Sequence, residues 1–163
     1  MKWIYRFENL FCGLMILAVT IVLFVNVVLR YVFNASTSWS EEFIRYGFIW
    51  ITFIGGAICV RQGSHVNVDL LANYLNKTGQ KVLFLITSVI ALVFIVWLGK
   101  LGLDTTIFNF ETGQKSPGLS IPIFYVYIAI PLGCLLMVIH YIELLINVLR
   151  GKDLRFHKDE NLA

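Results

Sequence analysis

The sequence predicts an all-α integral membrane protein with four transmembrane helices, and three observations support this fold class. Of the 163 residues, 58% are hydrophobic and 14% are charged, whereas about 25% of residues are charged in a soluble domain. The mean hydropathy is +0.78. Four stretches approach or exceed the roughly 20 apolar residues that a helix needs to cross the hydrocarbon core. These stretches are continuously apolar and do not alternate, which argues against a membrane β-barrel.

The four predicted spans lie at about residues 10–32, 40–61, 80–103 and 121–149, within a single membrane domain of residues 1–150. The first stretch is too long for the apolar segment of a cleaved signal peptide, so we expect it to remain as a span. The second span begins with Ser38 and Glu41, whose spacing predicts a capping box. We expect Pro122 in the first turn of the fourth span and a kink at Pro131.

The distribution of basic residues predicts that both ends of the chain lie inside. Lys and Arg concentrate on the cytoplasmic side of membrane proteins. With the N-terminus inside, nine of the 13 Lys and Arg residues fall on the inner side of the four spans. The sequence therefore predicts an N-in/C-in orientation, with residues 151–163 as a short charged cytoplasmic tail.

A short amphipathic segment separates the second and third predicted spans. Residues 66–77 are too few to cross the membrane, but Val68, Leu71 and Leu75 fall on one helical face and Asp69 and Asn73 on another. This pattern favours a helix lying along the cytoplasmic interface. The alternative is a polar loop with a helical turn.

Charged residues gather at the outer end of the first two predicted spans. Arg30 ends the first span, Glu41 and Glu42 begin the second, and Arg45 follows Glu41 by one helical turn. An ion pair of Arg30 with these carboxylates would reduce the cost of desolvating the guanidinium, and the Glu41–Arg45 spacing suits a local pair. Such a patch either fixes the hairpin or docks a partner. The full predicted outer patch comprises Arg30, Trp39, Glu41, Glu42, Arg45, Glu111 and Lys115.

The sequence contains no motif that indicates catalysis or the binding of a cofactor or metal. No catalytic, nucleotide-binding or metalloprotease motif is present, and the three cysteines lie inside apolar stretches, as packing residues do. His65 and Asp69 are one turn apart near Arg61, but a metal site would need a third ligand. We interpret these three residues as a cytoplasmic interface. We therefore predict no enzyme activity, metal site or cofactor, and the formal charge of +3 includes no dense basic patch for nucleic acid.

The middles of the predicted spans have almost no ionisable side chains. Such a side chain costs about 2.5–3.5 kcal/mol at the centre of a membrane helix, and it is a functional candidate where it occurs. A small proton-coupled exporter needs a titratable carboxylate deep in a span, and we find none. This pattern argues against an autonomous pump.

Several strings of residues match a known pattern. The most specific joins Arg30 and Tyr31 to Trp39, Glu41, Glu42 and Arg45. Further matching residues are Asn26 to Asn34, Gly56, Arg61, Gly63, His65, Val68, Asp69, Ser116, Pro117, Leu119, Pro122, Pro131 and Gly133. Over about residues 5–150 the chain resembles the small (DctQ-type) membrane subunit of tripartite ATP-independent periplasmic (TRAP) transporters.

That resemblance implies a division of labour. In this family, a periplasmic binding protein captures an organic anion such as sialic acid or a C4-dicarboxylate, and a larger membrane subunit transports it together with Na⁺. The small subunit would pair with the large one in the bacterial inner membrane and brace its fixed part. Its outer loops, at about residues 34–42 and 104–120, would help to receive the loaded binding protein. We expect any Na⁺ site to lie in the partner.

Two other functions stay open from the residues alone. An autonomous small four-helix transporter would transport substrate as the purified chain. A membrane anchor or sensor would dock a cytoplasmic partner through residues 150–158, so truncation after Gly151 would abolish its function.

Overall fold

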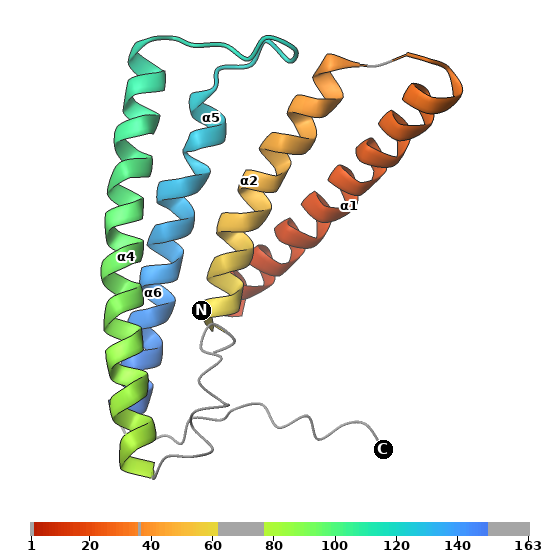
Figure 1. Cartoon of the computed structure of the whole chain (residues 1–163). Helices are drawn as coiled ribbons and strands as arrows, with labels where there is room; N and C mark the ends of the chain where they lie inside the picture. Colours follow the sequence, from red (N-terminus) through yellow and green to blue (C-terminus); the bar gives the residue numbers. More distant parts are fainter. Residues whose placement is uncertain (1, 36, 62–76, 150–163) are drawn as a thin grey trace, which may run out of the picture.

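The computed structural model describes residues 2–35, 37–61 and 77–149 of the chain (Figure 1). These residues form α1 (Lys2–Val32), α2 (Ser38–Arg61), α4 (Lys77–Glu111), α5 (Phe124–Tyr127) and α6 (Ala129–Leu149). Within the described ranges there is no strand, and a single isolated β-bridge pairs Lys115 with Pro122. The predicted interfacial helix lies outside these ranges except for Lys77, and the charged tail lies outside them altogether.

The predicted fold class is confirmed. Among the described residues, four helical segments are long and apolar enough to cross a membrane, namely Tyr5–Val32, Ser38–Arg61, Leu85–Glu111 and Phe124–Ile146. The orientation of these segments stays a prediction. The end of the row that contains Glu42 is called the outer end, and the end that contains Arg61 is called the inner end.

Two helices are longer than predicted from hydropathy. The first begins at Lys2 instead of about residue 10, and the third continues to Glu111 instead of ending near 103. Polar residues at these ends do not break a helix, whereas a hydropathy pattern stops where the apolar stretch stops. The third helix ends just before Gly113, whose positive φ of 61° leaves the helical region.

The fourth span is interrupted near its outer end. A short helix, α5, is separated from α6 by Ile128. Pro131 has no N–H to donate to the carbonyl of Tyr127, so the backbone cannot continue an ideal helix through this point. The predicted disruption by Pro131 is therefore found, but Pro122 lies before α5 and pairs with Lys115. Its predicted place in the first helical turn is wrong.

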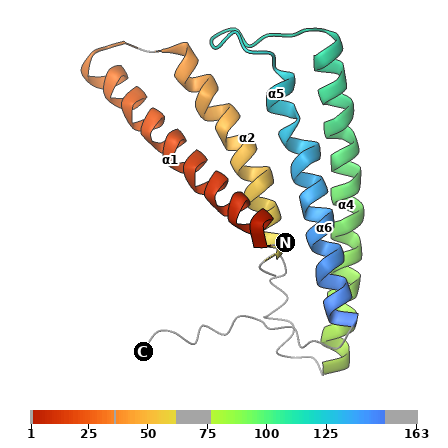
Figure 2. The same ribbon diagram turned by 180° about the vertical axis from the view of Figure 1, so that it is seen from behind.

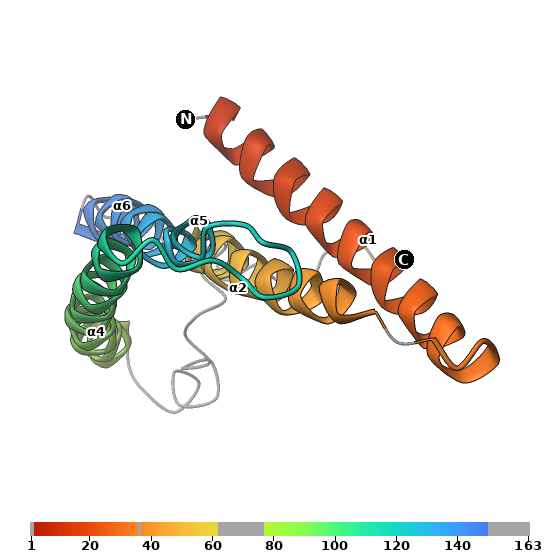
Figure 3. The same cartoon turned by 90° about the horizontal axis from the view of Figure 1, so that it is seen from above.

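The four spans form a row. Helix α1 packs on α2, α2 packs on α6, and α6 packs on α4. Seen from above, the helices follow one another from α1 to α4 in a single curved layer (Figure 3). The view from behind shows the same order, with α1 and α4 at the two edges (Figure 2). The edge helices thus each pack mainly on one neighbour, and both broad faces of the layer are open.

Glycines allow the helices in the row to approach closely. A Cβ on Gly133 of α6 would lie 2.5 Å from the Cβ and 2.9 Å from the carbonyl oxygen of Phe53 in α2. A Cβ on Gly47 of α2 would overlap a methyl group of Val19 in α1. Small residues play this role in membrane proteins, where packing rather than the hydrophobic effect brings helices together.

The buried core is small and lies between α2, α4 and α6. It consists of Ala57, Val60, Ile95, Cys134, Met137 and Tyr141. Large apolar side chains along α1 and α4 are exposed instead, for example Phe24 and Val93. Such an apolar surface is stable in contact with lipid or with another membrane protein, because exposing apolar side chains to either is not costly.

Candidate functional site

At the outer end, a buried carboxylate holds a surface loop. Glu42, in the second turn of α2, is 6% exposed. Its carboxylate accepts hydrogen bonds from the Ser116 hydroxyl, from the Gly118 N–H at 3.0 Å and from the Leu119 N–H at 2.9 Å. All three donors belong to the segment between α4 and α5, residues 112–123, which we call the outer loop. Charge-assisted bonds of this type are stronger than neutral ones, so Glu42 fixes the outer loop to α2.

The outer loop also has its own internal hydrogen bonds. The Ser116 N–H donates to the Ile121 carbonyl at 2.9 Å, and the Ile123 N–H donates to the Gln114 carbonyl at 3.0 Å. Most of the loop's side chains, including that of Lys115, are exposed. The outer loop is therefore held by its own backbone hydrogen bonds and by Glu42, and most of its side chains are exposed and available for contact.

Thr37, and not the predicted Ser38, is the residue that precedes the start of α2. Thr37 directly precedes the helix, its hydroxyl lies 2.8 Å from the Ser40 hydroxyl, and its carbonyl accepts from that hydroxyl at 2.7 Å. The predicted capping residue, Ser38, is already inside the helix. Thr37 also donates a long hydrogen bond of 3.4 Å to the Asn26 side chain, which links the ends of α1 and α2.

The predicted outer patch divides into one anchor and several exposed residues. Arg30, Trp39, Glu41, Arg45, Glu111 and Lys115 are all exposed. The predicted ion pair of Arg30 with Glu41 or Glu42 is wrong: in the described part of the chain, ion pairs join Glu8 to Arg61 and to His140 and do not involve Arg30. The reason is that donors from the outer loop already satisfy both oxygens of Glu42. Arg45 instead lies 5.4 Å from the ring centroid of Tyr46.

At the inner end, a second carboxylate joins three helices. Glu8 of α1 is 2% exposed, and its two oxygens lie 2.7 Å from Arg61 Nη1 in α2 and 3.0 Å from His140 Nε2 in α6. Arg61 also donates to the Asn9 side chain at 2.8 Å. A carboxylate can only accept hydrogen bonds, so His140 Nε2 has the hydrogen in this contact. The Glu8 cluster (Glu8, Arg61, His140) thus ties α1, α2 and α6 together.

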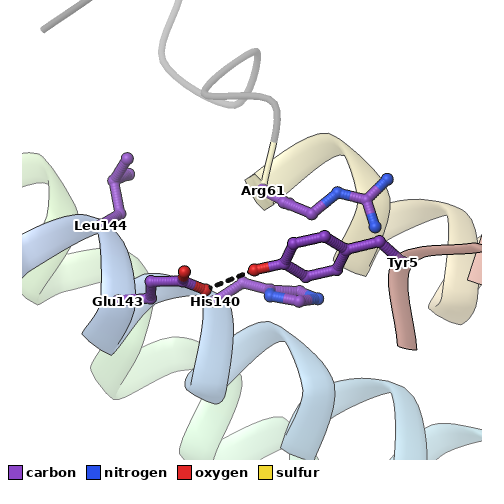
Figure 4. A pocket seen from close by; sticks show the side chains of 5 residues that line it. All are labelled: Tyr5, Arg61, His140, Glu143 and Leu144. Carbon is purple, nitrogen blue, oxygen red and sulfur yellow. Dashed lines mark hydrogen bonds between the residues drawn. The ribbon is translucent and has the colours of Figure 1, made fainter. Parts of the chain in front are cut away.

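A small pocket adjoins the Glu8 cluster (Figure 4). It has a volume of about 190 Å³ and is lined by Tyr5, Arg61, His140, Glu143 and Leu144. The Tyr5 hydroxyl donates to Glu143 at 2.7 Å, and the Arg61 guanidinium lies 4.5 Å from the Tyr5 ring centroid. Both contacts reinforce the junction of the three helices.

The outcome for the predicted cytoplasmic interface is mixed. Arg61 lies at the inner end as expected, but it pairs with a residue of α1. His65 and Asp69 lie outside the described residues. Sequence reasoning missed Glu8, because its two side-chain partners are 53 and 132 residues away along the chain. No group of three His, Cys, Asp or Glu side chains that could hold a metal ion occurs in the described part of the chain.

One lysine lies in the middle of its span, contrary to the prediction that these regions are almost free of charge. Lys100 of α4 is exposed and follows Gly99, whose Cβ position would lie 3.1 Å from the Cβ of Cys134. Cys134 is near the middle of the span Phe124–Ile146. The next residue along α6 outward, Gly133, contacts Phe53, near the middle of Ser38–Arg61. Lys100 is thus at about the same level as the middle of the α6 span and the middle of the α2 span.

Comparison with known proteins identifies the family. The family model described as "Tripartite ATP-independent periplasmic transporters, DctQ component" matches residues 19–151. The chain belongs to the DctQ component family of TRAP transporters. A putative TRAP transporter small permease protein of Haemophilus influenzae is 39% identical over 85 residues, which are 52% of this chain and 53% of that protein.

Two further TRAP relatives differ in length. The C4-dicarboxylate TRAP transporter small permease protein DctQ of Rhodobacter capsulatus is 29% identical over 119 residues, 73% of this chain and 52% of that protein. The sialic acid TRAP transporter permease protein SiaT of Haemophilus influenzae is 28% identical over 154 residues, 94% of this chain but 25% of that protein. The chain thus spans about half the length of the first two relatives and a quarter of the third.

Family membership fixes the general class of the protein. DctQ components are parts of a transporter, so this chain is a transport component and not an enzyme. It is a multi-pass protein of the inner membrane, consistent with the four helices among the described residues that are long and apolar enough to cross a membrane. The chain also matches one region of a longer TRAP permease.

Proposed function

We propose that this chain is the small permease subunit of a Na⁺-coupled secondary TRAP transporter. In this proposal the chain braces the large membrane subunit, which binds Na⁺ and substrate, and helps to dock a periplasmic substrate-binding protein. The substrate is an organic anion of the sialic acid or C4-dicarboxylate type. The names of two relatives support this class of substrate, since one is a C4-dicarboxylate and the other a sialic acid TRAP protein.

The anchored outer loop is the observation that best supports the docking role. A loop that is fixed by a buried carboxylate and by its own backbone bonds keeps its shape before it meets a partner. Such preorganisation lowers the entropy cost of binding. Because Glu42 is buried, it acts by holding the loop, while the exposed Lys115 and Glu111 are available for contact.

The docking role can be tested with Glu42→Ala and a matched control. Uptake into proteoliposomes that contain both membrane subunits is measured against the concentration of loaded binding protein. We expect Glu42→Ala to raise the half-saturating concentration at least about tenfold, because charge-assisted hydrogen bonds that order the loop are lost. The control is Glu41→Ala, which removes the neighbouring exposed carboxylate.

Copurification of the two membrane subunits separates docking from assembly. The proposal requires that Glu42→Ala still copurifies with the large subunit. An unchanged half-saturating concentration would reject the docking role, and loss of the large subunit would show that Glu42 only maintains the membrane complex.

A further inference from the structure

A continuous exposed stripe runs along α4 on both sides of Lys100. Residues three and four positions apart share a helix face, and the positions before and after Lys100 at this spacing are all exposed. We call this surface the Lys100 stripe; it consists of Val93, Trp97, Lys100, Asp104 and Ile107. The opposite face of α4 contains Ile95 and Gly99, which pack on α6.

Both ionisable side chains of the Lys100 stripe lie inside the apolar span Leu85–Glu111 of α4. Lys100 is level with Phe53, which is about 16 Å along α2 from Glu42 and about 12 Å from Arg61, at ~1.5 Å of rise per residue. Asp104 is one turn further outward. Ionisable side chains at such depths in a membrane almost always face protein or a water-filled cavity. Neither Lys100 nor Asp104 forms an ion pair with another described residue.

The exposed face of α1 provides a contrast within the same molecule. Its exposed side chains in the middle of the span include Leu14, Leu17, Ile21 and Phe24. These side chains are apolar, as a lipid-facing surface requires, whereas the Lys100 stripe at the opposite edge of the row combines apolar and charged groups. The two edges of the row therefore meet different surroundings.

We propose that the Lys100 stripe is the surface on which the large membrane subunit docks, with an acidic side chain of that subunit opposite Lys100 and a hydrogen-bond donor opposite Asp104. This inference rests on the proposed function. The large subunit is the favoured occupant because the family is part of a multi-component transporter, and because the SiaT match covers one quarter of a longer permease. Apolar neighbours such as Trp97 would surround the charged contact and exclude water from it.

Replacement of Lys100 by leucine has different expected effects if Lys100 faces a protein partner and if it faces lipid. If the large subunit covers Lys100, Lys100→Leu leaves an acidic side chain unpaired in the interface. We then expect at least about a tenfold loss of copurifying large subunit, with partial recovery in Lys100→Arg. The control is Lys115→Leu, the same change at an exposed position of the outer loop, which should leave copurification unchanged.

The outcomes separate this inference from the proposed function. If Lys100 faces lipid, Lys100→Leu leaves copurification unchanged and raises the thermal stability of the chain, which overturns the docking surface alone. If no large subunit copurifies even with the unsubstituted chain, both proposals are overturned.

A cross-linking experiment on the full complex gives an independent answer. A photoreactive amino acid at Trp97 should form a cross-link to the large subunit. Cross-links between two copies of this chain, or to lipid only, would overturn the assignment of the Lys100 stripe to the large subunit.

Discussion

At the scale of single residues, the buried carboxylate of Glu8 joins α1 to both α2 and α6. Its carboxylate pairs with Arg61 at 2.7 Å and contacts His140 at 3.0 Å, and it is 2% exposed. Removing one partner of a fully buried ion pair costs about 3–5 kcal/mol, because the remaining charge is left unpaired. The Arg61 side chain is 15% exposed, so water can partly solvate it after the change.

We therefore predict that Glu8→Gln lowers the free energy of unfolding by about 2–3 kcal/mol, somewhat less than for a fully buried pair. Unfolding is measured in mixed micelles through tryptophan fluorescence. Glu111→Gln, at an exposed position, should change it by less than about 0.5 kcal/mol. Equal effects of the two substitutions would show that the Glu8 cluster adds nothing to stability.

Residue patterns identified Glu42 as important but did not identify its partners. The string that contains Trp39, Glu41 and Glu42 is local, and its resemblance to the family is visible in the sequence. The donors to Glu42 come from residues 74 to 77 positions away, and two of them are backbone N–H groups. A backbone donor has no signature in the sequence. The contact with the outer loop could therefore be found only from the fold.

At the scale of elements, the spans were predictable and their packing was not. Hydropathy located all four spans, because lipid requires about 20 apolar residues of each. It did not give the start of α1 at Lys2 or the end of α4 at Glu111, since helices continue past the apolar stretch. The predicted third span, residues 80–103, placed Lys100 near its outer end. The close contact of α4 with α6 at Gly99 shows its true depth.

The packing of α6 on α2 gives a prediction at this scale. A Cβ on Gly133 would lie 2.5 Å from the Cβ of Phe53, so Gly133→Ala must push the two helices apart. We expect it to lower the free energy of unfolding by about 1–3 kcal/mol, as overpacked sites do. Gly13→Ala is the matched control, because no atom lies within 4 Å of that Cβ position. Equal stability of both variants would contradict the close α2–α6 contact.

At the scale of the whole molecule, the row of helices explains how the chain can serve as a subunit. A single layer has two open faces and two edges, and in this chain one edge is apolar while the other contains Lys100 and Asp104. The Glu8 cluster fixes the inner end of the row, and Glu42 fixes the outer loop at the other end. Such a molecule offers surfaces for partners on several sides. We propose that the transport site itself lies in the large subunit.

In the proposed function, this chain supports transport by a partner and does not transport alone. The most direct measurement is uptake of the organic anion into proteoliposomes under an inward Na⁺ gradient, with the loaded binding protein outside. We predict uptake when this chain and the large subunit are both present, and none when either is omitted. Uptake by this chain alone, or undiminished uptake by the large subunit without it, would contradict the account.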